Sequence, residues 1–204
     1  RIVTLNPDMV AQAEKSPTLK QWLQEADDIV ADGHGLQWAA RYLNKQSLHI
    51  ITGVSLVEHL LAQAIGRLYI IGGKPTEIKP TITQLQHRYP KANIVGYHHG
   101  YFNEHDSEQI YVDIATKQPT IVIIAVGFPK QEYVTQYLAQ TPLKAITIGV
   151  GGAIDVVSGQ KKAAPPWIIK LKCEWLYRAW QEPRRILRWT HLIGFINLVR
   201  MKKP

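Results

Sequence analysis

Asp32 is the residue in this sequence best placed to act as a catalytic base. It follows the apolar run Asp28–Ala31, which predicts a strand, and Gly33 comes directly after it. The carboxyl ends of parallel strands form the ligand-binding edge of an α/β sheet, where a carboxylate can take a proton from an attacking hydroxyl. Asp is also a preferred N-cap, so capping of a helix that begins near Gly35 is the alternative role.

Thr4 and Asn6 lie at the end of the first predicted strand, Ile2–Leu5, and are expected at the same edge of the sheet. Their hydroxyl and amide groups could bind a sugar hydroxyl. Asn6 precedes Pro7, however, and Asn and Pro together also favour a turn. Sugar contact and turn formation therefore both stay open for Asn6.

Two glycine pairs, Gly72-Gly73 and Gly151-Gly152, follow the third and the last predicted strands. Glycine lets backbone N–H groups approach a phosphate closely, although a structural turn fits either pair equally well. Lys74 lacks the following Ser or Thr of a P-loop, and Ile154 occupies the last glycine position of the G-x-G-x-x-G motif. These departures weaken the ATPase and dehydrogenase interpretations.

Three arginines near the end of the chain, Arg178, Arg185 and Arg188, are spaced by seven and three residues. In a continuous helix this spacing places them on one face, although Pro183 interrupts or restarts such a helix. Guanidinium groups that converge in this way can hold a diphosphate bidentately. A solvated helix face is the alternative interpretation.

Metal and hydrolase chemistry find little support in the sequence. No Asp-x-Asp pair is present, and the adjacent His98 and His99 cannot easily aim at one ion from a strand end. The Gly-x-Ser-x-Gly turn of serine hydrolases is absent as well. We therefore expect a site without a metal and without a cofactor.

The elements that would position these residues alternate between strand and helix. Apolar, β-branched runs predict strands over Ile2–Leu5, Asp28–Ala31, Leu68–Ile71, Asn93–Gly96, Thr120–Val126 and Ala145–Val150. Helical patterns lie between them over Leu19–Glu25, Leu36–Leu43, Leu56–Ile65, Ile82–Tyr89 and Gln131–Ala139. This order predicts a Rossmann-like α/β fold: a mainly parallel sheet with helices on both faces, followed by a C-terminal helical appendage.

Charge divides the 204 residues into two parts, an α/β body over residues 1–159 and an appendage over residues 160–204. The body holds 13 Lys and Arg against 14 Asp and Glu, whereas the appendage holds 11 against 2 together with four of the six tryptophans. Basic residues interleaved with Trp indicate an anionic membrane surface better than a nucleic acid. The longest apolar run of the appendage, Leu192–Val199, is far shorter than the roughly 20 residues of a membrane-spanning helix.

The single cysteine, Cys173, gives no sign of an oxidising compartment, so we expect a cytoplasmic protein. The chain opens with Arg1 inside a predicted strand, from which we expect that upstream residues are missing.

Six strings, met in order along almost the whole chain, resemble the WecG/TagA/CpsF family of bacterial glycosyltransferases, glycosyltransferase family 26. The strings are Thr4–Pro7, Ala31–Gly33, Gly72-Gly73, Gly127–Glu132, Gly149–Gly152, and Glu174–Arg178 with Gln181–Arg185. Gly-x-Pro-Lys-Gln-Glu and Glu-Trp-Leu-Tyr-Arg are the most specific of them.

The resemblance implies an inverting, metal-independent hexosyltransferase on the inner face of the bacterial cell membrane. Its donor would be UDP-N-acetylmannosamine, the uronic acid of that sugar or a related UDP-sugar. Its acceptor would be polyprenyl-diphosphate-linked N-acetylglucosamine, in teichoic acid or other cell-surface polysaccharide synthesis. By the same resemblance Asp32 would be the general base. Sugars would contact Thr4, Asn6 and Gln131, and Arg178, Arg185 and Arg188 would hold diphosphate near the membrane.

One departure from the family pattern concerns Ile50–Ser55, where the family usually carries Arg and Asp. The departure puts the identity of the sugar in doubt, and it leaves open a peripheral membrane protein that binds nucleotide sugars without turnover. A homo-oligomer is also considered, because nothing in the sequence decides the oligomeric state.

Overall fold

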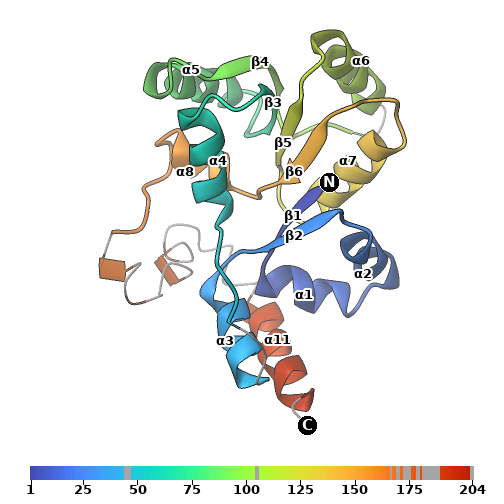
Figure 1. Cartoon of the computed structure of the whole chain (residues 1–204), viewed down its shortest axis with the longest axis vertical. Coiled ribbons are helices and arrows are strands. Elements are labelled where there is room, and N and C mark those ends of the chain that lie inside the picture. Colours follow the sequence, from blue (N-terminus) through green and yellow to red (C-terminus); the bar gives the residue numbers. More distant parts are fainter. Residues whose placement is uncertain are drawn as a thin grey trace.

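A parallel sheet forms the centre of the molecule (Figure 1). The computed structural model describes residues 1–43, 47–103, 106–165, 167–168, 171, 176–177, 180 and 189–202. The strands are β1 (Ile2–Leu5), β2 (Asp28–Ala31), β3 (Arg67–Gly72), β4 (Asn93–His98), β5 (Ile121–Ala125) and β6 (Ile146–Gly149). They lie in the order β2-β1-β6-β5-β3-β4, and every pairing is parallel. The predicted α/β class with a mainly parallel sheet is confirmed.

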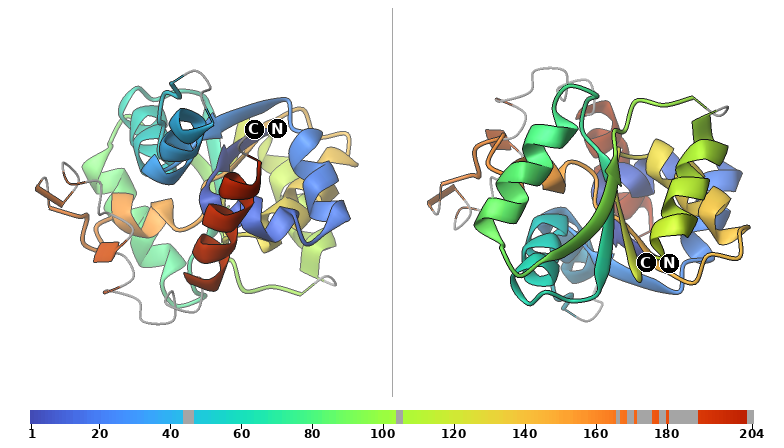
Figure 2. Two further views of the ribbon diagram at one scale, coloured as in Figure 1. Left: turned by 90° about the horizontal axis from the view of Figure 1, so that it is seen from below. Right: turned by 90° about the horizontal axis from the view of Figure 1, so that it is seen from above.

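Helices connect the strands and cover both faces of the sheet. They are α1 (Pro7–Ala13), α2 (Pro17–Gln24), α3 (His34–Tyr42), α4 (Gly53–Ala62), α5 (Ile78–Arg88), α6 (Ser107–Lys117), α7 (Lys130–Ala139), α8 (Ala153–Val157) and α11 (Trp189–Met201). Figure 2, right, shows α5 and α6 on opposite sides of the strands. The predicted C-terminal helix is present as α11.

The two-residue repeat of the central strands explains this two-sided cover. Leu68 and Ile70 of β3 are fully buried against α4, α5 and α8, whereas Tyr69 and Ile71 are fully buried against α6 and α7. Side chains alternate between the faces of a strand, so a continuous apolar run supplies both cores. Each buried aliphatic side chain contributes about 1.5–3 kcal/mol to the free energy of unfolding.

Three helices were not foreseen from the sequence: α1, α6 and α8. In α1, the Asn6 side-chain oxygen accepts a hydrogen bond from the Met9 N–H at 3.1 Å, and Pro7 is the first helical residue. Asn at the N-cap and Pro at the first position are helix-start signals. The Asn-Pro pair therefore opens a helix here, where we expected either a turn or a sugar contact.

Helix α11 packs onto the α/β body although it belongs to the basic appendage. Phe195 and Val199 are 2% and 5% exposed, in one cluster with Ala11, Leu36 and Ala39. The two panels of Figure 2 and Figure 1 agree in placing α11 beside α1. Residues 160–204 thus include a helix that completes the core, and their separation from the body at residue 159 stays a proposal.

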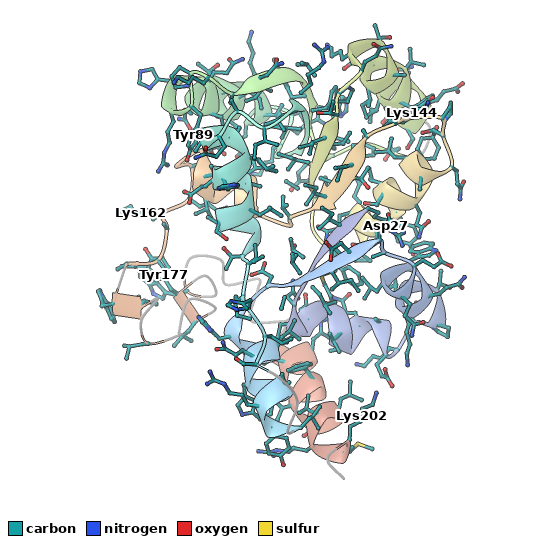
Figure 3. All side chains as sticks on the ribbon, viewed as in Figure 1. Asp27, Tyr89, Lys144, Lys162, Tyr177 and Lys202 are labelled. Atoms are coloured by element: carbon teal, nitrogen blue, oxygen red, sulfur yellow. The ribbon has the colours of Figure 1, made fainter. Side chains whose placement is uncertain are left out.

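The appendage is also fixed by a polar contact at the start of α11. His191 Nδ1 lies 2.6 Å from Asp8 Oδ1, in the first turn of α1. Lys202 follows the last residue of α11. Figure 3 shows it at the opposite end of the molecule from Lys144, which follows α7. In the part of the chain described, no helix has the length and apolarity to cross a bilayer.

Candidate active site

A polar cleft of about 750 Å³ lies at the carboxyl edge of the sheet. Residues that follow all six strands line it: Asn6 after β1, Asp32 after β2, Gly73 after β3, Tyr101 after β4, Gly127 after β5 and Gly151 after β6. Loops at this edge are where ligands of open α/β sheets bind. The cleft is therefore the candidate active site.

Most of the predicted site residues share this cleft. Thr4, Asn6, Asp32, Gly73, Gln131, Gly151 and Gly152 line it. Gly72 is buried behind the wall, where an added Cβ would lie 2.8 Å from the Cβ of Ala125, so its small size serves the packing of β3 against β5. Arg178, Arg185 and Arg188 lie outside the described residues, and their diphosphate role stays a prediction.

The Asp32 carboxylate faces helix α4 and not the helix that follows it in sequence. Its Oδ2 accepts a hydrogen bond of 3.4 Å from the N–H of Gly53, the first residue of α4. The N-cap of α3 is Gly33, which makes no side-chain cap bond. The alternative role as a cap near Gly35 is therefore not the one seen, and the carboxylate lies at the positive end of the α4 dipole.

Thr4 and Asn6 both make bonds that shape the cleft. The Thr4 hydroxyl, in a residue only 3% exposed, donates to the Gly149 carbonyl at 2.7 Å and so joins the ends of β1 and β6. The Asn6 oxygen caps α1, as described above. The structure thus gives each a positioning role at the cleft wall, and their contact with a sugar stays a prediction.

Gln131 holds the turn between β6 and α8. Its Oε1 accepts from the Gly151 N–H at 3.0 Å, and its Nε2 donates to Glu132 Oε1 at 3.4 Å. The side chain lies so close to Gly149 that an added Cβ there would be 2.8 Å from Nε2. Because the Gly151 N–H is used by Gln131, a phosphate at this turn would have to compete for that donor.

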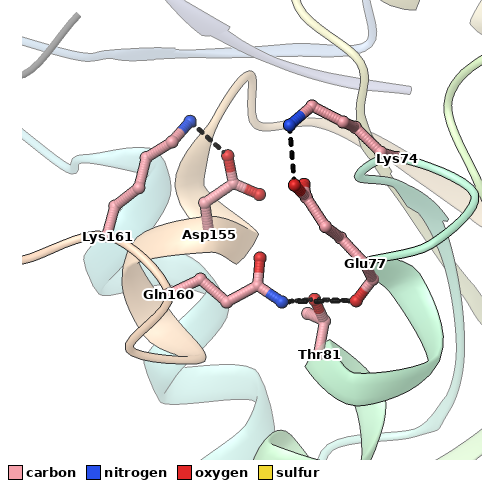
Figure 4. A network of polar contacts seen from close by, with 6 residues as sticks. All are labelled: Lys74, Glu77, Thr81, Asp155, Gln160 and Lys161. Carbon is pink, nitrogen blue, oxygen red and sulfur yellow. Dashed lines mark hydrogen bonds and ion pairs between the residues drawn. The ribbon is translucent and has the colours of Figure 1, made fainter.

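A wall of alternating charges closes the cleft on the α5 and α8 side (Figure 4). Lys74 Nζ lies 2.6 Å from Glu77 Oε1, and Lys161 Nζ lies 2.5 Å from Asp155 Oδ2. The hydrogen bond to Glu77 raises the pKa of Lys74. Both ammonium groups point toward the same opening, so this wall offers cations that are already held in place.

Gln160 ties the two halves of the wall together. Its Nε2 donates to Thr81 Oγ1 at 2.5 Å and to the Glu77 carbonyl at 3.2 Å. This fixes the turn after α8 against the first turn of α5. Sequence reasoning missed Gln160 and Thr81, because their contact joins positions 79 residues apart.

Two further residues were missed, Lys130 in the cleft and Glu132 behind Gln131, and both belong to the first turn of α7. Lys130 lines the cleft and binds the loop after β4. Glu132 is only 1% exposed, burial raises the pKa of its carboxyl, and its Oε2 has no hydrogen-bond partner among the described residues. The Gly-x-Pro-Lys-Gln-Glu string was the available signal for them.

No three His, Cys, Asp or Glu side chains come together as metal ligands in the described ranges. The rings of His98 and His99 are in contact, with centroids 4.2 Å apart, and His98 Nδ1 lies 2.8 Å from the His99 carbonyl oxygen. Independence of a metal stays a prediction.

A parallel α/β sheet with a polar cleft over its carboxyl edge defines a small-molecule-binding protein of the α/β class. The chain belongs to the family described as "Glycosyl transferase WecG/TagA/CpsF family", whose model matches residues 1–203. It is a glycosyltransferase.

Several curated relatives carry one name, N-acetylglucosaminyldiphosphoundecaprenol N-acetyl-beta-D-mannosaminyltransferase. The Bacillus subtilis (strain 168) protein is 33% identical over 95% of this chain and 75% of its own length. The Bacillus spizizenii protein is 31% identical over 97% and 77%. The Staphylococcus aureus (strain MW2) protein is 33% identical over 99% and 80%. The similarity covers the cleft and the appendage alike.

Proposed function

We propose that this protein transfers N-acetylmannosamine, its uronic acid or a related sugar from a UDP-sugar to N-acetylglucosamine linked to a polyprenyl diphosphate. The observation that carries the proposal is that Asp32 lines the same cleft as Lys74 and Lys161. The names of the relatives supply the sugar and the acceptor. The product would enter a cell-surface polymer such as teichoic acid.

In the proposed reaction, Asp32 removes the proton of the acceptor hydroxyl. The hydroxyl oxygen bonds to the anomeric carbon of the donor sugar while the bond from that carbon to the UDP oxygen breaks, and UDP leaves with the electron pair. One displacement from the face opposite UDP inverts the anomeric configuration. Ammonium and guanidinium groups would offset the charge that develops on the diphosphate, so no metal is required.

Two lysines that line the cleft support metal independence. Lys74 and Lys161 are each fixed by a carboxylate at 2.5–2.6 Å, so their ammonium groups are oriented before a donor binds. Arg178, Arg185 and Arg188 are proposed to act with them on the acceptor or nucleotide diphosphate, since planar guanidinium forks match phosphate oxygens.

The deciding experiment is a screen of UDP-sugars with a polyprenyl-diphosphate N-acetylglucosamine analogue, with the product read by mass and its anomeric configuration by NMR. We expect one N-acetylmannosamine-type donor to be transferred with inversion, at the same rate with and without EDTA. Retention, or loss of activity in EDTA, would contradict the proposed mechanism. Donor binding without any product would favour the non-catalytic alternative that the Ile50–Ser55 departure raised.

The Ile50–Ser55 departure lies next to Asp32, the proposed general base. Ser55 Oγ donates to the Thr52 carbonyl at 2.9 Å, and Thr52 Oγ1 accepts from the Ser55 N–H at 3.0 Å. The pair caps α4 one residue away from Gly53, the donor to Asp32. In place of the family's charged residues, this chain therefore has neutral caps beside its carboxylate.

The basic appendage is proposed to bring the enzyme to the inner face of the membrane. Deleting residues 160–204 would also remove α11 and uncover Leu36 and Ala39, so a truncation would change membrane binding and folding together.

A variant that keeps α11 changes Lys170, Lys172 and Arg184 to Gln. Because each basic residue near an anionic leaflet contributes about 1 kcal/mol, we expect much weaker flotation with anionic vesicles. Unchanged flotation would place the membrane site on the body.

A further inference from the structure

The ammonium group of Lys130 contacts a single loop of the cleft. Nζ donates to the Gly100 carbonyl at 2.8 Å and to the Phe102 carbonyl at 2.9 Å, and it lies 4.2 Å from the centre of the Phe102 ring. Hydrogen bonds from a charged donor are stronger than neutral ones, and an aromatic face adds to the attraction. All three contacts fall in residues 99–103, which follow β4.

Those residues form one wall of the cleft. The Gly100 N–H donates to the Gly73 carbonyl at 2.8 Å, which joins the loop to the glycine turn after β3. An added Cβ at Gly100 would lie 2.7 Å from Val126, so the loop is packed closely against the end of β5. Tyr101, 66% exposed, lines the cleft from this loop.

No carboxylate pairs with Lys130 among the described residues. The side chain is half-buried, and burial lowers its pKa. A partly desolvated ammonium group without an anionic partner is stabilised here by backbone carbonyls, so removing it would leave the loop without its strongest attachment to α7.

We propose that Lys130 is a positioning residue for donor binding, which acts by holding the loop of residues 99–103 in place as a wall of the cleft. The inference rests on the proposed function in that the donor is a UDP-sugar. Gln131, the next residue, holds the β6–α8 turn, where its Oε1 accepts from the Gly151 N–H. The first turn of α7 therefore attaches both walls that flank β5.

The test compares Lys130→Met, which keeps the aliphatic stem and removes the donors, with Lys130→Arg, which keeps charged donors. Lys144→Met is the matched control, because Lys144 is exposed beyond the other end of α7 (Figure 3). Two quantities are measured: amide hydrogen exchange of residues 99–103 in the ligand-free protein, and kcat and KM for the UDP-sugar.

In Lys130→Met we expect exchange at Gly100 and its neighbours to accelerate about tenfold or more, because the attaching bonds are lost. The donor KM should rise about tenfold while kcat changes by less than about threefold, and Lys130→Arg should restore much of both. Lys144→Met should match the unmodified protein in every measurement.

Three results would overturn the proposal. Unchanged exchange in the ligand-free Lys130→Met protein would show that Lys130 does not hold the loop. A lower kcat at unchanged KM would remove the link to donor binding, as would faster exchange with both constants unchanged. The exchange measurement needs no substrate, so a failure of the proposed transferase activity would be recognised separately, as absence of turnover in the unmodified protein.

Discussion

The two sides of the cleft are built from different interactions. On the β1 and β2 side, helix caps and backbone bonds place the polar groups: Asn6 caps α1, and Asp32 accepts from the start of α4. On the β3 and β6 side, ion pairs do so, Lys74 with Glu77 and Lys161 with Asp155. The first side presents the Asp32 carboxylate, which is suited to proton transfer, beside the Asp8–His191 pair. The second side presents oriented cations, which are suited to binding. We infer that chemistry and donor recognition are divided between them.

The largest effect that would test this division is expected at Asp32. Asp32→Asn keeps the size of the side chain and removes the proton acceptor, so kcat should fall about 100-fold to 10,000-fold with little change in UDP-sugar affinity. Asp28→Asn, at the exposed amino end of the same strand, is the control and should remain active. Near-normal kcat in a stable Asp32→Asn protein would remove the catalytic assignment.

Gly149→Ala should disturb the turn after β6, which is held by the side chain of Gln131. The new Cβ would lie 2.8 Å from Gln131 Nε2, in a side chain that is buried and bonded at both ends. We expect a loss of about 1–3 kcal/mol in the free energy of unfolding, measured by denaturant titration. Gly194→Ala meets no atom within 4 Å in α11, so this control should leave stability unchanged or raise it by about 0.5–1 kcal/mol.

Lys161→Met should weaken donor binding on the β3 and β6 side of the cleft and leave the chemical step unaffected. Loss of one oriented cation is expected to reduce UDP-sugar affinity about tenfold, an effect that should shrink as salt is added. The turnover number should stay close to normal. Lys20→Met removes another lysine paired with a carboxylate, Glu14 at 3.1 Å, but on an exposed surface, and should not change affinity. A fall in kcat at constant affinity would contradict the division.

The smallest effect is expected for Glu132→Gln, and it should depend on pH. Burial raises the pKa of Glu132 in the folded protein, so this carboxyl favours folding at low pH. Its contribution is lost as pH rises from the unfolded-state pKa, near 4.3, through the raised folded-state pKa. Glu132→Gln should therefore gain stability relative to the unmodified protein over that window, within about 1 kcal/mol, as followed by thermal unfolding from pH 4 to pH 8. A difference that is constant with pH would mean that the group does not titrate there.

Many of the strands and helices could be predicted, because the sequence patterns that mark them lie within a few neighbouring residues. Strands β1 and β2 begin and end at the predicted residues, Ile2–Leu5 and Asp28–Ala31, since short apolar runs rich in β-branched residues and bounded by polar turns mark a strand. Asp32 was placed at the cleft by the same rule, as the first polar residue after a strand. Helix α1 was missed because its Asn-Pro start was weighed as a turn.

The attachments within the site could not be predicted, because they join residues far apart in sequence. The bond from Thr4 to Gly149 spans 145 residues, and that from Gln160 to Thr81 spans 79. Neither residue type nor spacing indicates such a partner. Gln131 shows the consequence: its amide holds the Gly151 turn, which nothing in the sequence indicated, and its contact with a sugar stays a prediction.

The place of β1 in the sheet has a consequence for how the chain folds as it is synthesised. β1 pairs with β2 at once, but its other edge pairs with β6, where Ile2 lies opposite Ile148 and Val3 opposite Gly149. β1 must therefore wait for β6, which is synthesised after the other strands of this sheet, and Leu36 and Ala39 wait longer still for Phe195 and Val199 of α11. Contacts of such long range slow folding and leave apolar edges exposed meanwhile. We expect the β1–β2 region to be the part that nascent chains protect last, and the part most dependent on chaperones.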